Sequence, residues 1–236
     1  MATIDYVKKE MFFKIVYYGP EGSGKTTNIS MIYNRIPKGC KPELKSVPSP
    51  FDSSVLFDLL QFEFKMENGF VGKLALHSCP GHGDCNSSRK LVLKGVDGIV
   101  MVFDAAADKI EQNIESYTNL KNNIREYGYK LKFIPTLFQY NKRDLPNALM
   151  QAELNERLNN DKHPSVEVIA VKDKGVIDSL KMIVSSVYCQ LNSKYATKEE
   201  SMVSPDIDIL QPVEDIKEKS NSSSSDEAFF DLESLL

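Results

Sequence analysis

Residues 19–26, with the sequence GPEGSGKT, have the types and spacing needed to bind the phosphates of a nucleotide. They fit the pattern G-x-x-x-x-G-K-[ST], in which consecutive backbone N–H groups surround the phosphates. We expect the Lys25 ammonium to reach the β- and γ-phosphates and the Thr26 hydroxyl to bind Mg²⁺. The alternative is a glycine-rich turn that binds nothing. A strand pattern before the segment and a helical pattern after it favour phosphate binding.

Residues 141–144, with the sequence NKRD, indicate which base is bound. The Asp144 carboxylate can accept hydrogen bonds from the N1–H and the exocyclic amine of guanine, whereas adenine offers no matching pair of donors. Asn141 would tie this loop to the phosphate loop, and the Lys142 stem would cover the base. Alone, the segment also fits an ordinary charged turn. Ala170, after the last predicted strand, is placed to give a backbone N–H to the guanine oxygen.

A third segment, residues 78–82 (SCPGH), is the candidate turn that senses the γ-phosphate. His82 stands where a water-positioning residue belongs. Because histidine titrates near neutral pH, a neutral His82 could orient the attacking water, and the imidazolium could offset developing charge. One alternative is a surface-loop histidine. Another is a zinc site with Cys79 and Cys85, which would lack a fourth ligand.

The first elements of the chain should position the phosphate loop. An apolar run over 12–18 ends in glycine, which is typical of a buried strand, and a helical pattern covers 25–35. Residues 36–54 contain four prolines and a glycine, which interrupt helices and strands, so we expect no regular structure there. A connection of this length is rarely passive, so we expect a functional loop.

The rest of the folded part alternates between strands and helices. Residues 55–65 and 71–77 read as a hairpin around Asn68-Gly69. Further strands are predicted over 98–104, 133–139 and 166–170, and helices over 110–127, 148–159 and 176–191. The pattern predicts an α/β fold with a mostly parallel six-stranded sheet, one antiparallel edge hairpin and helices on both faces.

Composition separates a mildly basic body from an acidic tail. The net charge is -4, with 29 Lys and Arg against 33 Asp and Glu, so no global field attracts nucleic acid. Residues 197–236 hold 11 of the acids and 3 of the bases. We predict a folded domain over 1–195 and a disordered, serine-rich tail over 196–236. The tail either only solubilises the protein or uses its Phe- and Leu-containing end to bind a partner.

The cysteines and apolar segments indicate a protein of the cytoplasm. The four cysteines lie far apart, without a framework spacing, so we expect reduced thiols (Cys40, Cys79, Cys85, Cys189). The N-terminus has no secretory signal, and no window approaches the ~18 apolar residues of a spanning helix. We therefore expect no integral membrane segment. We also expect a monomer.

The segments KIVYYGPEGSGKTTN, SRKLVLKGVDGIV and QYNKRDLPNA resemble the bacterial MglA-type, or mutual gliding-motility, small Ras-like GTPases. The resemblance covers residues 11–191 and implies the P-loop small-GTPase fold. It also implies a GTP/GDP switch that controls cell polarity or motility, with possible recruitment to a cell pole. A Roadblock-type (MglB-like) partner would bind the GTP form and stimulate hydrolysis. The loop at 37–54 and the first hairpin strand would rearrange with the nucleotide.

The sequence departs from the family pattern in two places, and at Ser78 it also departs from small GTPases in general. The family's Arg-Thr pair is Ser53-Ser54 here, so Ser54 keeps a hydroxyl for Mg²⁺ but Ser53 cannot act as an arginine finger. Ser78 stands where small GTPases usually have an Asp that holds the Mg²⁺ shell through water. His82 replaces the family's glutamine and resembles the catalytic histidine of elongation-factor GTPases. An arginine finger is worth roughly 10³ to 10⁵ in rate, so turnover could be very slow.

The predicted site combines residues for Mg²⁺, catalysis and the nucleotide. Mg²⁺ would be held by Thr26 and Ser54, and His82 would be catalytic. In the resemblance, Gly81 gives its N–H to the γ-phosphate. The predicted nucleotide-binding residues are Gly19, Glu21, Gly22, Ser23, Gly24, Lys25, Thr26, Thr27, Gly81, Asn141, Lys142, Asp144, Ala170 and Val171.

Three functions remain open on the sequence. The first is a GTPase switch whose site is completed by a partner. The second is a GTP-bound scaffold that hydrolyses negligibly and recruits effector or polarity proteins. This hypothesis is based on Ser53, Ser78 and the tail. The third, an ATP enzyme such as a nucleotide kinase, is disfavoured by NKRD and by the lack of a lid-like run of arginines.

Overall fold

The computed structural model describes residues 3–38, 41–49, 56–66, 69–81 and 85–195. The strands are β1 (Thr3–Asp5), β2 (Glu10–Tyr18), β3 (Leu44–Pro48), β4 (Leu56–Lys65), β5 (Val71–Ser78), β6 (Gly98–Asp104), β7 (Thr136–Asn141) and β8 (Ser165–Glu167). The α-helices are α1 (Lys25–Arg35), α2 (Asn86–Leu93), α3 (Ile110–Glu126), α4 (Gln151–Leu158) and α5 (Val176–Tyr195). Short 3₁₀ turns are η2 (Ala107–Lys109), η3 (Leu131–Phe133) and η4 (Ala170–Lys172).

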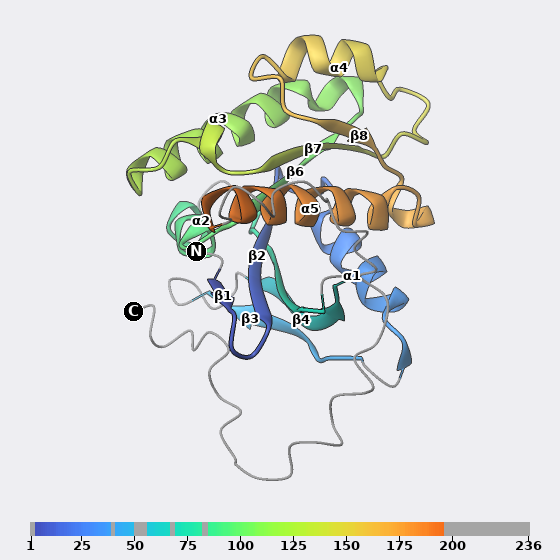
Figure 1. The fold of residues 1–236 in the computed structure, drawn as a ribbon. Helices are drawn as coiled ribbons and strands as arrows, with labels where there is room; N and C mark the ends of the chain where they lie inside the picture. The colour runs from blue at the N-terminus through green and yellow to red at the C-terminus, as the bar shows by residue number, and fades with distance from the viewer. Residues whose placement is uncertain (1–2, 39–40, 50–55, 67–68, 82–84, 196–236) are drawn as a thin grey trace.

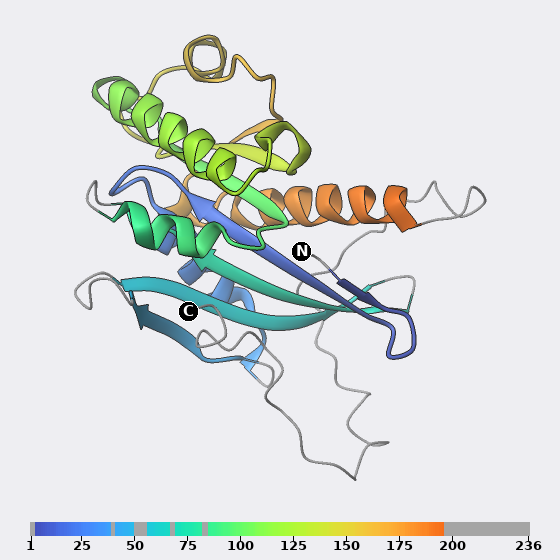
Figure 2. The same ribbon diagram turned by 90° about the vertical axis from the view of Figure 1, so that its left-hand side faces the viewer.

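The strands form one eight-stranded sheet in the order β3-β4-β5-β2-β6-β7-β8, with β1 paired to β2. Strands β5, β2, β6, β7 and β8 are parallel, whereas β3 and β4 are antiparallel to their neighbours. Figures 1 and 2 show β3 and β4 at one end of the sheet, and Figure 1 shows β7 and β8 at the other. The predicted α/β class with a mostly parallel sheet and an antiparallel hairpin is confirmed.

Two apolar clusters hold the helices on opposite faces of the sheet. One contains buried side chains of α1 and α5, and the other contains those of α2, α3 and α4. All seven residues of β6 are buried because helices cover both of its faces. Because β2, β6 and β7 are parallel, the loops that follow them leave the sheet at the same edge, which is where open α/β sheets bind ligands.

The structure contains elements that the sequence analysis missed. Residues 44–48 form β3, so the prediction that residues 36–54 lack regular structure is wrong for them. The ladder from Leu44 opposite Leu60 to Pro48 opposite Leu56 offsets the weak local preference, and a proline is tolerated at the end of an edge strand. The three-residue strand β1 and the helix α2 were also not predicted. With β1 and β3 the sheet has eight strands, so the predicted number of six is wrong. The predicted last strand ends at Glu167, and Ala170 begins η4.

No helix in the described part of the chain is long and apolar enough to cross a membrane. The tail over 196–236 lies outside the described residues, so the division at residue 195 stays a prediction.

Helix α3 offers a test of the packing on its face of the sheet. Leu120 is completely buried, whereas Ile114 on the same helix is 39% exposed. We expect Leu120→Ala to lower the free energy of unfolding by about 2–5 kcal/mol, because it leaves a cavity in the core. Ile114→Ala, the matched control, should cost less than about 1 kcal/mol. Urea unfolding measures both values, and equal losses would contradict this packing.

Candidate functional site

The phosphate loop connects the end of β2 to the start of α1. Gly24, just before α1, has φ 101°, a left-handed conformation that favours glycine. A Cβ at this position would lie 2.2 Å from Nδ2 of Asn141, so a side chain would displace the Asn141 loop. Gly22 has φ 70° and is exposed, while Ser23 is completely buried. The loop thus has its glycines where the backbone must turn sharply or approach another loop.

Lys25 lies inside this loop. Its side chain is buried, and Nζ donates to the carbonyl oxygens of Gly19, at 3.0 Å, and Pro20, at 2.6 Å. Burial lowers the pKa of Lys25 to about 8 because the ammonium loses hydration. Phosphate oxygens next to the ammonium would favour its charged form.

Thr26, in the first turn of α1, meets β4 and β5 at Asp58. Its hydroxyl donates to Oδ2 of Asp58 at 2.7 Å. Ser78 at the end of β5 donates to the same carboxylate oxygen at 3.0 Å and accepts the backbone N–H of Asp58 at 2.7 Å. Ser46 of β3 donates to Oδ1 at 3.2 Å. Asp58 therefore supplies, from the neighbouring strand, a carboxylate at the position where Ser78 has only a hydroxyl.

This oxygen set fits Mg²⁺. Magnesium is commonly held by one or two carboxylates, hydroxyls, waters and the phosphates of a nucleotide rather than by an all-protein cage. The described residues contain no cluster of three or more His, Cys, Asp or Glu that could hold a metal alone. Thr26 and Asp58 could hold the ion directly or through water. Ser54, the other predicted ligand, lies outside the described residues.

The predicted sensing turn lies against the phosphate loop. A Cβ at Gly81 would be 2.5 Å from Cα of Glu21, so the two backbones touch and only glycine fits. Arg89 of α2 donates through Nε to the carbonyl of Pro80 at 2.9 Å, and through Nη2 to that of Gly81 at 2.6 Å. His82, the predicted catalytic residue, lies outside the described residues, as does Ser53.

Asn141, at the end of β7, joins the phosphate loop to the loop that contains Ala170. Its Nδ2 donates to the carbonyl of Ser23 at 2.8 Å, and its Oδ1 accepts the backbone N–H of Ala170 at 2.9 Å. The structure thus brings these two loops together, with Asn141 between them. The Ala170 N–H, which we expected to face the guanine oxygen, is bonded to Asn141, so its role toward the base stays a prediction.

The other residues of the base loops are accessible. Asp144 forms an ion pair with Lys172 of η4 at 3.1 Å, and the hydrogen bond lowers the pKa of the Asp144 carboxyl. Lys142 has φ 63° and pairs with Asp104, at the end of β6, at 2.7 Å. Val171 is 66% exposed. A guanine that binds to Asp144 would have to compete with or displace Lys172.

Two functional candidates escaped the sequence analysis. Asp58 stands alone among apolar residues of a predicted strand, in the run LFDLL. Counting pairs back from the hairpin turn places it opposite Ser78, one step beyond the Leu59–His77 pair. Arg89 lies in a segment that carries the family resemblance, but the sequence near it does not predict its contacts, because they form between segments that meet only in the folded chain.

Thr27, a predicted site residue, is half-buried on α1.

Cys79 and Cys85 are both buried, and neither forms a disulfide. Within the described residues they belong to no group of three or more His, Cys, Asp or Glu that could hold a metal. Burial raises the pKa of the Cys79 thiol to about 12, so without a metal the thiol stays protonated at neutral pH. Cys189, on α5, is also free. The zinc interpretation has no support from these residues.

The fold and these loops define a class of protein. A phosphate loop follows a central strand, an oxygen cluster lies beside it, and base loops meet it at the same sheet edge, which is the arrangement of a P-loop protein with the small-GTPase fold. No protein-family model matches the chain. It is 41% identical over 191 residues to the mutual gliding-motility protein MglA of Myxococcus xanthus (strain DK1622), covering 81% of this chain and 98% of that protein. The chain belongs to the MglA-type family.

The position of Asp58 leads to a prediction about magnesium. Asp58→Asn should weaken Mg²⁺ binding by the nucleotide complex about 10- to 100-fold, as loss of a group that orients metal ligands typically does. The measurement is the Mg²⁺ concentration needed to slow the release of a fluorescent GDP. Glu63→Gln, on the same strand but half exposed and paired with Lys73, is the matched control. An unchanged Mg²⁺ requirement in Asp58→Asn would contradict the assignment.

The lowered pKa of Lys25 predicts a pH dependence. Below about pH 8 the lysine of the free protein is already charged, whereas above about pH 8 it must take up a proton from the solution when the nucleotide binds. Binding of GDP should therefore take up close to one proton at pH 9 and much less at pH 7, and affinity should fall as pH rises through 8. Calorimetry in buffers of different ionisation enthalpy measures the uptake.

Lys14 provides the control for this measurement. Burial also lowers its pKa to about 8, but its Nζ donates to the carbonyl of Lys94, away from the phosphate loop. Lys14→Met should show the same uptake as the wild type. Equal uptake at pH 7 and pH 9 in the wild type would show that Lys25 does not titrate as stated.

Proposed function

We propose that the protein is a GTP-binding molecular switch that hydrolyses GTP slowly or only with a partner. The observation that supports it most is the position of Asn141, which bonds the phosphate loop through Ser23 and the third base loop through Ala170. A site for the phosphates and a site for the base are thereby held at a fixed separation. Asp144, with two carboxylate oxygens, selects guanine over adenine.

The proposed division of labour follows from the contacts. The backbone N–H groups of the phosphate loop and the Lys25 ammonium bind the β- and γ-phosphates. Mg²⁺, held near Thr26, Asp58 and Ser54, would neutralise charge on the phosphates. Gly81 presents its N–H to the γ-phosphate, so the sensing turn takes a different position with GTP than with GDP. His82 positions the attacking water.

The cellular role is proposed from the family. The relative's name refers to gliding motility, so we propose that this switch controls cell polarity or motility through nucleotide-dependent binding of partners. A Roadblock-type (MglB-like) protein would stimulate hydrolysis, and effector or polarity proteins would bind the GTP form, with the tail over 196–236 as one contact. We propose a cytoplasmic monomer that is recruited to a cell pole.

A GTP-bound scaffold with negligible hydrolysis is the second candidate. Ser53 replaces the family's arginine. Of the five arginines, Arg35, Arg143 and Arg157 pair with acids, Arg125 is in the last turn of α3, and Arg89 donates to the carbonyls of Pro80 and Gly81. Glu21, whose backbone touches Gly81, adds a negative charge to this part of the site, which would disfavour the negative charge that develops during hydrolysis. Both features disfavour fast turnover.

Release of phosphate in a single turnover tests the switch against the scaffold. The full-length protein is loaded with GTP and mixed with Mg²⁺, with and without the Roadblock-type partner. We expect phosphate release to exceed nucleotide exchange when the partner is present, and His82→Ala to slow it by about 10²-fold or more, where 10² is the lower end of the usual range for a positioned proton-transfer group.

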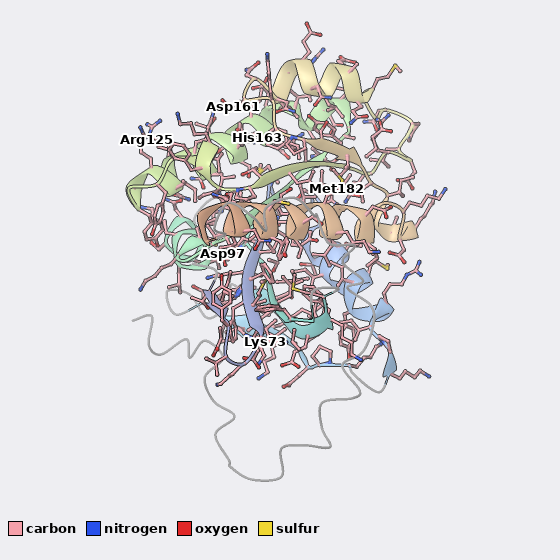
Figure 3. The ribbon with its side chains drawn as sticks, in the orientation of Figure 1. Lys73, Asp97, Arg125, Asp161, His163 and Met182 are labelled. Carbon is pink, nitrogen blue, oxygen red and sulfur yellow. The ribbon has the colours of Figure 1, made fainter. Side chains whose placement is uncertain are left out.

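The two outcomes have different consequences. Release that never exceeds exchange would favour the scaffold. Equal rates for the wild type and His82→Ala would remove His82 from the mechanism while leaving the switch in place. His163→Ala is the control, because this histidine contacts Tyr117 of α3 on a different part of the molecule (Figure 3).

A further inference from the structure

Arg89 is a buried cation that the proposed function does not use. It lies in the first turn of α2, and only 6% of its surface is exposed. It belongs to SRKLVLKGVDGIV, one of the segments that carry the family resemblance. Burying a guanidinium costs free energy unless its N–H donors form hydrogen bonds. The acceptors of these hydrogen bonds therefore indicate the role of Arg89.

Two of its donors hold the sensing turn. Nε and Nη2 donate to the consecutive carbonyls of Pro80 and Gly81, at 2.9 and 2.6 Å. A planar guanidinium has its donors in a fixed fork, so bonds to two successive carbonyls fix the orientation of the peptide units as well as their position. The N–H of Gly81 is thereby given a defined direction.

The other side of the guanidinium is anchored to α3. Nη1 donates to Oδ1 of Asn119 at 3.1 Å, and the guanidinium lies over the ring of Tyr18, 5.9 Å from its centre. Tyr18 also donates to Oδ1 of Asn119, and the amide of Asn119 donates to Asn86 at the start of α2. The anchor is therefore a set of bonded groups on β2, α2 and α3 rather than a single flexible contact.

Arg89 also lies close to the start of the phosphate loop. It lines a pocket of about 270 Å³ together with Pro20 and Glu21 of the phosphate loop, Gly81, and residues of α3. Its donors reach the carbonyls of the turn, which leaves the N–H of Gly81 for the nucleotide. The other arginines of the chain do not line this pocket.

We propose that Arg89 is a positioning residue that sets the preference for GTP over GDP by holding the Pro80–Gly81 turn in place to contact the γ-phosphate. This inference rests on the proposed guanine-nucleotide switch. Since GDP has no γ-phosphate, the order that Arg89 imposes on the turn contributes to the binding of GTP and not to that of GDP. A residue needed only for folding would affect both nucleotides equally.

The test compares the affinities of GDP and of a non-hydrolysable GTP analogue in the full-length protein. Arg89→Gln removes the charge and the fork, and Arg89→Lys keeps the charge but can reach only part of the turn. We expect Arg89→Gln to weaken the GTP analogue about tenfold or more while GDP changes less than about twofold, with Arg89→Lys in between. Asn119→Ala, which removes the anchor on α3, should change the ratio in the same direction.

Arg157→Gln is the matched control, because it makes the same change at an exposed arginine of α4 that pairs with Glu153. Its ratio should equal that of the wild type. Equal weakening of both nucleotides in the Arg89 variants, no change in either, or a selective loss of GDP would overturn the proposal. If Arg89→Gln does not fold, as judged by circular dichroism, Arg89→Lys and Asn119→Ala decide the matter.

Failure of the proposed function would look different. A wild-type protein that binds neither GDP nor the GTP analogue would refute the guanine-nucleotide switch itself. A wild type that binds both, with an unchanged ratio in every Arg89 and Asn119 variant, would refute only the positioning role of Arg89.

Discussion

The side chain of Asn141 is the contact on which the rest of the site depends. Its amide lies between two loops that are far apart in the chain and donates to one while it accepts from the other. The close approach at Gly24 follows from it, because a Cβ there would meet the amide nitrogen. The parallel sheet makes this possible by bringing the ends of β2, β7 and β8 to one edge.

A second constraint is the placement of negative charge beside the phosphate loop. Ser78 carries none, but Asp58 lies on the adjacent strand and bonds both Ser78 and Thr26. The chain thus keeps a carboxylate near Thr26 although it comes from a different strand. In the proposed switch, binding of nucleotide and Mg²⁺ would therefore survive changes that slow hydrolysis. Ser53, Glu21 and His82 would affect the proposed hydrolysis rather than the binding.

The parts of the fold that could be predicted are those with local or periodic signals. Apolar runs and helical spacing identified the central strands and the long helices, and Asn68-Gly69 identified the hairpin. Strand β3 could not be predicted, because its order comes from the ladder with β4. In the site, GPEGSGKT and NKRD have fixed spacing. Asp58 bonds side chains that are 12 to 32 residues away and Arg89 bonds groups that are 8 to 30 residues away, so only register and packing place them.

All these proposals require that the site binds a guanine nucleotide. The most direct measurement is the identity of the nucleotide on protein that has been purified from its own cells without added nucleotide, denatured and resolved by chromatography. We expect GDP or GTP to be bound in close to a one-to-one ratio with the protein. A bound adenine nucleotide, or none at all in the presence of Mg²⁺, would contradict it.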